Sequence, residues 1–157
     1  MDFIDALRLP VRAGLAAGVA YWAAEAMGLG GPIYALVSAV VVTEVDAAHT
    51  RKLALPRMLG TLVGAAVGTL AALSIPARPL MVAAGVAAAM VICGLLRVPA
   101  AARVAGYVSG ILMVGFAVDP WAHARDRIGA TLVGIVAAAL VSLVPLLLPP
   151  RQGGTPS

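Results

Sequence analysis

The sequence predicts an all-α polytopic membrane protein in which six transmembrane helices form a 3+3 inverted repeat. Apolar residues make up 62% of the 157 positions and charged residues only 11%, whereas a typical soluble domain has about a quarter of its residues charged. Prolines, glycines and charged residues divide the chain into six apolar segments, and one short phrase occurs near the start of two of them. Too few polar residues are present to cover a soluble domain, so the chain is expected to lie in a lipid bilayer.

A single transmembrane domain is predicted over residues 1–150, with repeat halves at about 8–76 and 80–148, followed by a short polar cytoplasmic tail at 151–157. The first apolar run has neither a basic leading region nor a small-residue cleavage site. It is therefore predicted to be a retained signal-anchor helix.

The positions of proline and glycine predict where the helices begin and end. A bilayer core about 30 Å thick needs about 20 apolar residues per helix, and fewer where the bilayer thins. The first helix ends at a glycine-rich turn that includes Pro32, because glycine and proline continue a helix only at a cost. The third begins at Pro56, since proline is favourable in a first turn, and a kink is expected at Pro145. The predicted bounds are 9–27, 33–45, 56–75, 80–96, 100–118 and 124–148.

The distribution of basic residues predicts an orientation in the inner (plasma) membrane with both termini in the cytoplasm. The outer loops then carry only Arg78, Arg125 and Arg127. The inner segments carry Arg8, Arg12, Arg51, Lys52, Arg57, Arg97, Arg103 and Arg151. The formal charge is +4, but these residues form no dense basic run, so nucleic acid is not an expected partner.

The repeated phrase is RMLGTLVG at residues 57–64 and RIGATLVG at 127–134, which pairs Arg57 with Arg127 and Thr61 with Thr131. The preceding segments also correspond, with Tyr34 opposite Tyr107. Because each half has three helices, an odd number, the second half is expected to lie upside down relative to the first. The alternative is that two helices rich in alanine, glycine and valine resemble each other through composition alone.

The phrase has a packing role and a candidate chemical role. The small residues at every fourth position predict close helix packing in lipid. They are Gly60, Gly64 and Gly68 in the first copy and Ala130, Gly134 and Ala138 in the second, and Gly14 with Gly18 and Gly106 with Gly110 are expected to pack in the same way. On a helix, the arginine, the threonine and the second glycine of each phrase share one face.

Arg57, Thr61, Arg127 and Thr131 are the candidates for the permeation path of an anionic solute. Each arginine is predicted to sit at a helix N-terminus, where the helix dipole favours anions, with a threonine one turn deeper to donate hydrogen bonds. The inversion would place the two arginines at opposite membrane faces as matched positive mouths, and a guanidinium suits a carboxylate. The alternative is that they only anchor the helices at lipid headgroups.

Glu25 and Glu44 are the proton-coupling candidates, because an ionisable group in or near a membrane helix is expensive and marks function. Placement in the interface without a role is the alternative for both, and Glu44 could instead pair with Arg51 or Arg57. Asp119 is predicted to cap a helix, and His49 and His123 are expected in loops.

No site for enzymatic catalysis, a metal or a cofactor is predicted. The sequence offers no paired carboxylates, no nucleophile with a base, no metal-ligand cluster and no phosphate-binding loop. Cys93 lies in an apolar run and is expected to serve packing.

GGPIYALVSAVVVTEVDAAHTRKLALPRMLGTLVGAAVG at 30–68 and ARDRIGATLVGIVAAALVSLV at 124–144 resemble the fusaric acid resistance and aromatic acid exporter superfamily, to which plant aluminium-activated malate channels are distantly similar. The resemblance covers about residues 8–148. It implies an inner-membrane module that exports organic or aromatic carboxylates using the proton gradient, with the four candidate residues near the path. Many relatives add a further domain, so a homo-oligomer or accessory transport subunits are expected here.

Three functions follow for a protein whose partners are the lipid bilayer and small organic anions. The first is a proton-coupled secondary exporter, and the second is a passive anion channel on the same scaffold. The third is a membrane assembly or accessory subunit without transport of its own, in which only the glycine stripes would matter.

Overall fold

The described residues form six α-helices and contain no strand. The computed structural model describes residues 3–44, 47–74, 78–115 and 119–143. The helices are α1 (Phe3–Ala26), α2 (Pro32–Val42), α3 (Ala47–Ser74), α4 (Pro79–Leu95), α5 (Pro99–Val114) and α6 (Pro120–Ser142). The predicted all-helical fold with six helices is thus confirmed, whereas the expected kink at Pro145 and the polar tail lie outside the described residues.

Prolines and glycines set most of the helix boundaries, as expected. Proline stands in the first turn of α2, α4, α5 and α6, where its missing N–H removes no helical hydrogen bond. Between α1 and α2 the chain turns through Gly28, whose φ of 67° lies in the left-handed region that glycine enters without strain. The Asp119 side chain accepts hydrogen bonds from the Trp121 and Ala122 backbone N–H groups, at 3.0 and 3.1 Å, so the predicted cap of α6 is confirmed.

The predicted start of the third helix at Pro56 is wrong. α3 begins at Ala47 and carries Pro56 in its interior. A proline inside a helix removes one hydrogen bond, but residues 47–55 contain no glycine or further proline that would end the helix before it. The sixth helix likewise begins at Pro120, one turn before the predicted 124.

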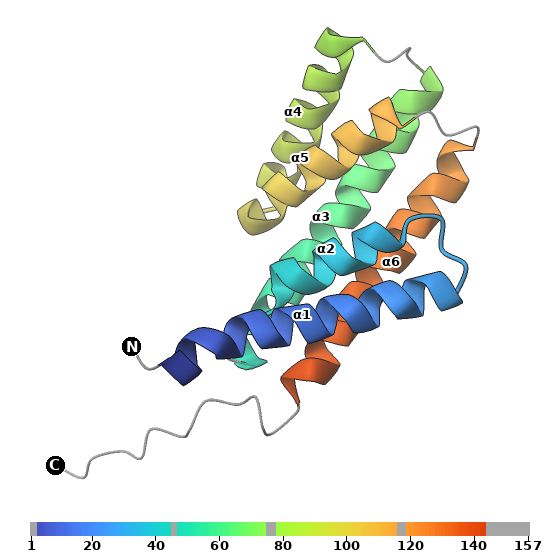
Figure 1. Ribbon diagram of the computed structural model, residues 1–157. Helices are drawn as coiled ribbons and strands as arrows, with labels where there is room; N and C mark the ends of the chain where they lie inside the picture. Colours follow the sequence, from blue (N-terminus) through green and yellow to red (C-terminus); the bar gives the residue numbers. More distant parts are fainter. Residues whose placement is uncertain (1–2, 45–46, 75–77, 116–118, 144–157) are drawn as a thin grey trace, which may run out of the picture.

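Consecutive helices run in alternating directions, so that the start of α1 and the end of α6 fall at the same end of the molecule (Figure 1). α1, α2 and α6 enclose one buried cluster, and α3 packs against α4 and α5 around another. Each three-helix group therefore contains one helix from the other half of the chain. α3 and α6 also contact each other and join the two groups.

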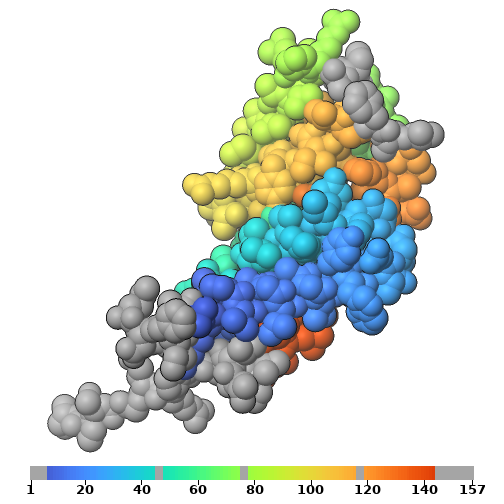
Figure 2. All heavy atoms as spheres, in the orientation of Figure 1, coloured from blue at the N-terminus to red at the C-terminus, as the bar shows by residue number. Residues whose placement is uncertain are grey.

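Small residues build the interior and large apolar residues face outward. Most buried apolar residues are alanines, whereas the side chains of Leu95, Leu80 and Trp22 are 78%, 73% and 70% exposed. Figure 2 shows α1, α2 and α5 on one such face. Large exposed apolar surfaces are rare on soluble monomers, and small-residue interiors are typical of helices packed in lipid.

Length and hydropathy identify one spanning helix among the described residues. The segment Ala48–Ser74 is both long and apolar enough to cross a bilayer. Pro32–Val42, Pro79–Leu95 and Pro99–Val114 are apolar but shorter. The hydropathy of the described helices therefore supports one of the six predicted spans directly.

The glycine stripe of α3 packs closely against another helix, as predicted, and that helix is α5. A Cβ atom on Gly60 or Gly64 would lie 2.5 Å from a carbonyl oxygen of α5, and one on Gly68 would lie 2.8 Å from another. Gly134 of α6 meets the Ala35 carbonyl of α2 in the same way. A Cβ atom on Gly106 or Gly110 would lie close to side chains of α4. A Cβ atom on Gly14 or Gly18 would have no neighbouring atom of this chain within 4 Å, so the close contact expected of that pair within the chain is wrong.

Candidate functional site

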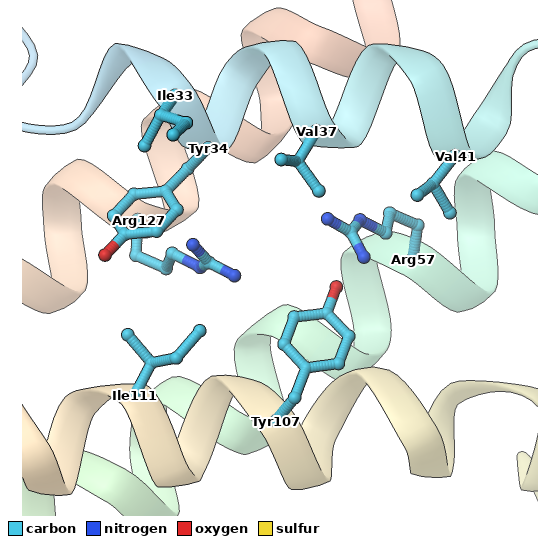
Figure 3. Close-up of a pocket in the computed structure, with 8 residues that line it drawn as sticks. All are labelled: Ile33, Tyr34, Val37, Val41, Arg57, Tyr107, Ile111 and Arg127. Atoms are coloured by element: carbon cyan, nitrogen blue, oxygen red, sulfur yellow. The ribbon is translucent and has the colours of Figure 1, made fainter.

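A pocket of about 370 Å³ opens between α2 and α5, with α3 and α6 behind it (Figure 3). Its walls are apolar except for two tyrosines and two arginines. Its lining residues are Ile33, Tyr34, Val37 and Val41 of α2, Arg57 of α3, Tyr107 and Ile111 of α5, and Arg127 of α6. The pocket therefore draws on both halves of the chain.

The two arginines of the repeated phrase lie deep in this pocket. Arg57 is 3% exposed and Arg127 is 2% exposed, and their guanidinium groups point toward each other from opposite ends of the pocket (Figure 3). They are close enough for their positive charges to interact. No carboxylate is among the lining residues, so the pocket carries two positive charges without an acidic partner in its walls.

Tyrosine rings supply the surroundings of these charges. The Arg127 guanidinium carbon lies 3.7 Å from the ring centroid of Tyr34. The ring of Tyr107 is shared, because its centroid lies 5.2 Å from the guanidinium carbon of Arg57 and 5.7 Å from that of Arg127. The negative face of an aromatic ring attracts a cation, so both rings stabilise the buried charges.

Thr61 and Thr131 lie at the point where α3 and α6 meet. Their hydroxyl oxygens are 3.4 Å apart, and both residues are buried. Each hydroxyl also donates to the carbonyl of the arginine one turn earlier, at 2.9 Å. A threonine hydroxyl has a single proton, so the donor expected for a solute is already engaged within the helix, and neither threonine lines the pocket.

The fusaric acid resistance protein-like family model matches residues 19–141, which is more than half of the chain and includes every residue that lines the pocket. The chain belongs to this family. The resemblance predicted from the sequence is thereby confirmed. No curated protein and no solved structure matches the chain.

Membership of the fusaric acid resistance protein-like family gives the chain a membrane location and a role of the transport and efflux type. The members are transporters and are not typically enzymes. The exposed apolar side chains agree with a lipid environment, because lipid tails are as apolar as these side chains and burial inside the bundle gains little.

The expected arrangement of the two arginines as separate mouths is wrong. It required a helix N-terminus at each arginine, but Arg57 lies inside α3 and Arg127 inside α6. The dipole therefore contributes little, because its effect falls off within the first turn. Instead of lying at opposite faces, both side chains reach one pocket.

The acidic candidates lie away from this pocket. Glu25 is exposed near the end of α1, and Glu44 is half-buried just after α2. The alternative pairing of Glu44 with Arg57 does not occur among the described residues, where Arg57 donates to Ser38. The backbone amide of Glu44 instead donates to the Thr50 hydroxyl at 3.0 Å.

Sequence reasoning missed three members of the site. Tyr34 and Tyr107 were paired in the repeat but received no role, although a tyrosine within an apolar segment signals a polar contact. Ser38 stands in a run of alanine and valine and gave no signal. The expected loop positions of His49 and His123 are wrong, because His49 lies in α3 and His123 in α6. The ring of His123 is perpendicular to that of Tyr34, and the two ring centroids are 6.3 Å apart.

Proposed function

We propose that this chain exports small organic or aromatic carboxylate anions across the inner membrane through the pocket between α2 and α5. The observation that carries the proposal is the pair of buried guanidinium groups that face one pocket without a carboxylate in its walls. Burying a charge costs several kcal/mol unless a counter-charge compensates it. A carboxylate that enters the pocket supplies this counter-charge.

The walls of the pocket suit the remainder of such a molecule. Ile33, Val37 and Ile111 offer apolar surface, and Tyr107 offers an aromatic ring beside both cations. A small anion with an apolar or planar body gains apolar burial as well as charge pairing. A strongly hydrated inorganic anion gains only the second.

We also propose that six membrane-spanning helices form the 3+3 inverted repeat, with both termini in the cytoplasm. The exchange of α3 and α6 between the two helix groups supports a pseudo-two-fold relation. Two equivalent residues that lie beside a two-fold axis must lie close to each other. Thr61 and Thr131 are equivalent in the aligned phrases, and they are in contact. Labelling of single cysteines placed in the α1–α2 and α4–α5 turns tests the orientation, because these turns must be accessible from opposite sides.

A homo-oligomer remains part of the proposal. The α2 side of the pocket is formed by exposed apolar residues, with Ile33 58% and Val41 51% exposed. A second copy of the chain would cover them and enclose the pocket. Native mass spectrometry of the detergent-extracted protein tests this, and a monomer at all protein concentrations would contradict it.

Two ways of driving transport are distinguished by experiment. Proton coupling requires a titratable group that senses the solute, and Glu44 is the candidate because it is half-buried at the end of α2, the helix that forms one wall. A passive anion channel is favoured by a different observation, the absence of any carboxylate or histidine among the lining residues.

The test is efflux of radiolabelled benzoate from proteoliposomes at a pH where benzoate is ionised, with protein-free liposomes as the baseline. Removing both guanidiniums by Arg57→Gln and Arg127→Gln should lower the flux at least about tenfold, because charged hydrogen bonds are lost. The exposed Arg103→Gln is the matched control and should leave the flux unchanged. An undiminished flux in the double variant contradicts the proposal.

The same vesicles separate the two modes of transport. Accumulation of benzoate against its gradient under an imposed pH difference, lost in Glu44→Gln, supports proton coupling. A current that reverses at the benzoate equilibrium potential and is insensitive to the pH difference supports the channel.

A further inference from the structure

The two arginines of the pocket have different hydrogen-bonding states. The Nε and Nη2 atoms of Arg57 both donate to the Oγ atom of Ser38, at 3.4 and 3.1 Å. In Arg127, the Nε and Nη1 atoms are buried and have no hydrogen-bond acceptor. One guanidinium is therefore held by the protein, and the other has unused donors.

The free guanidinium is also oriented for an incoming anion. Tyr34 covers one face of the Arg127 guanidinium at 3.7 Å, and a ring stacked on that face leaves the in-plane N–H groups available. The third nitrogen, Nη2, is not among the enclosed unpartnered atoms. Because Nη2 forms one edge of the guanidinium with Nε and the other with Nη1, a carboxylate that reaches Nη2 can accept two parallel hydrogen bonds.

We propose that Arg127 is the direct ligand of the carboxylate, and that Arg57 contributes its positive charge from a position fixed by Ser38. This assignment rests on the proposed function. Ser38 is then a positioning residue, which holds Arg57 to one end of the pocket and leaves the space beside Tyr107 for the body of the anion. The carboxylate is thus oriented toward the α6 end of the pocket and the apolar body toward Tyr107.

Two charge-conserving variants test the assignment through benzoate binding to the purified full chain, measured by isothermal titration calorimetry. Arg127→Lys should weaken binding at least about tenfold, because lysine retains the charge but neither stacks on Tyr34 nor offers a bidentate edge. Arg57→Lys should weaken it less than about threefold, because a fixed charge is still present. Each variant must retain the cooperative thermal unfolding of the wild type.

A double-mutant cycle tests the role of Ser38. Ser38→Ala should weaken benzoate binding about twofold to fivefold when Arg57 is present, and should have no effect in the Arg57→Gln background, since coupled residues deviate from additivity. Ser109→Ala is the matched control, because Ser109 is also a buried serine but belongs to α5, and its hydroxyl makes no hydrogen bond to either arginine. It should leave binding unchanged in both backgrounds.

The outcomes separate the assignment from the function beneath it. If the wild type binds benzoate but Arg57→Lys weakens binding as much as Arg127→Lys, the assignment is overturned and the proposed function stands. If Ser38→Ala acts equally with and without Arg57, the role of Ser38 is overturned. If the wild type binds no benzoate, the proposed function itself fails, and the assignment fails with it.

Discussion

The contact of α3 with α5 and the contact of α6 with α2 use the same kind of surface to different extents. Three glycines of α3 lie against three carbonyl groups of α5 that are one helical turn apart. In α6, Ala130 and Ala138 occupy the aligned positions around the single Gly134. Close approach along α3 is therefore distributed over three turns, whereas along α6 it depends on one residue.

The second contact also leads directly to the pocket, because Gly134 faces the Cβ atom of Ser38, the residue that holds Arg57. A change in packing there moves a functional side chain. In the first contact, none of the atoms nearest to the three glycines belongs to Ser38 or to a residue that lines the pocket. Two similar helix crossings can therefore differ in whether a change in their packing is transmitted to the site.

The largest effect is expected for Gly134→Ala. The added methyl group would collide with the Ala35 carbonyl and lie 2.7 Å from the Ser38 Cβ atom, and overpacking of this kind costs about 3 kcal/mol of unfolding free energy. Benzoate binding should weaken as well, because Ser38 must move. Thermal unfolding in detergent and calorimetry measure the two effects, and unchanged binding would break the link between this contact and the pocket.

A smaller effect is expected for Gly64→Ala. Its methyl group would lie 2.5 Å from the Ala105 carbonyl oxygen, which should cost about 2 kcal/mol because this contact is less tight than the one at Gly134. Benzoate affinity of the folded fraction should stay at the wild-type value. A loss of affinity equal to that of Gly134→Ala would show that both contacts reach the site.

Thr61→Val and Thr131→Val test the junction between the two helix groups. Each removes a buried hydroxyl hydrogen bond and should lower the unfolding free energy by about 1 kcal/mol. The double variant should cost less than the sum, because the two hydroxyl groups are in contact. Thr69→Val is the control and should not lower the unfolding free energy, since the Thr69 hydroxyl is buried without a hydrogen-bond partner and its removal breaks no bond.

The smallest effect, and the only stabilising one, is expected for Gly14→Ala. A Cβ atom at this position meets nothing within 4 Å, and alanine is favoured over glycine in a helix by about 0.5 to 1 kcal/mol. A rise in the unfolding temperature confirms that Gly14 has no packing role. A destabilisation would indicate that another chain packs against it.

Local signals were enough to predict the helices, because proline and glycine act within a few residues. The exceptions are the start of α3, which the sequence predicts at Pro56, and the start of α6, which it predicts at residue 124. A proline can also lie inside a helix that packing supports. These two boundary errors placed Arg57 and Arg127 at helix termini instead of in helix interiors and led to the wrong arrangement of two separate mouths.

The candidate site was only partly predictable. The repeated phrase identified Arg57 and Arg127 because arginine is conspicuous in an apolar chain. Two features of the site depend on contacts between helices, namely the contacts of α2 with α3 and of α5 with α6. They are the hydrogen bond from Arg57 to Ser38 and the position of both arginines in one pocket. Contacts between helices distant in sequence leave no periodic trace, so neither could be deduced from spacing.

The exchange of α3 and α6 between the two helix groups bears on how the chain is made. When synthesis has reached Ser74, the glycine face of α3 has no partner, because α5 begins only at Pro99. The contact of α2 with α6 likewise forms only when α6, the last of the described helices, has been made. The group of α3, α4 and α5 can close only after α5 has been made, and the group of α1, α2 and α6 only after α6 has been made. The pocket, which Arg127 of α6 lines, is therefore completed only by the sixth helix.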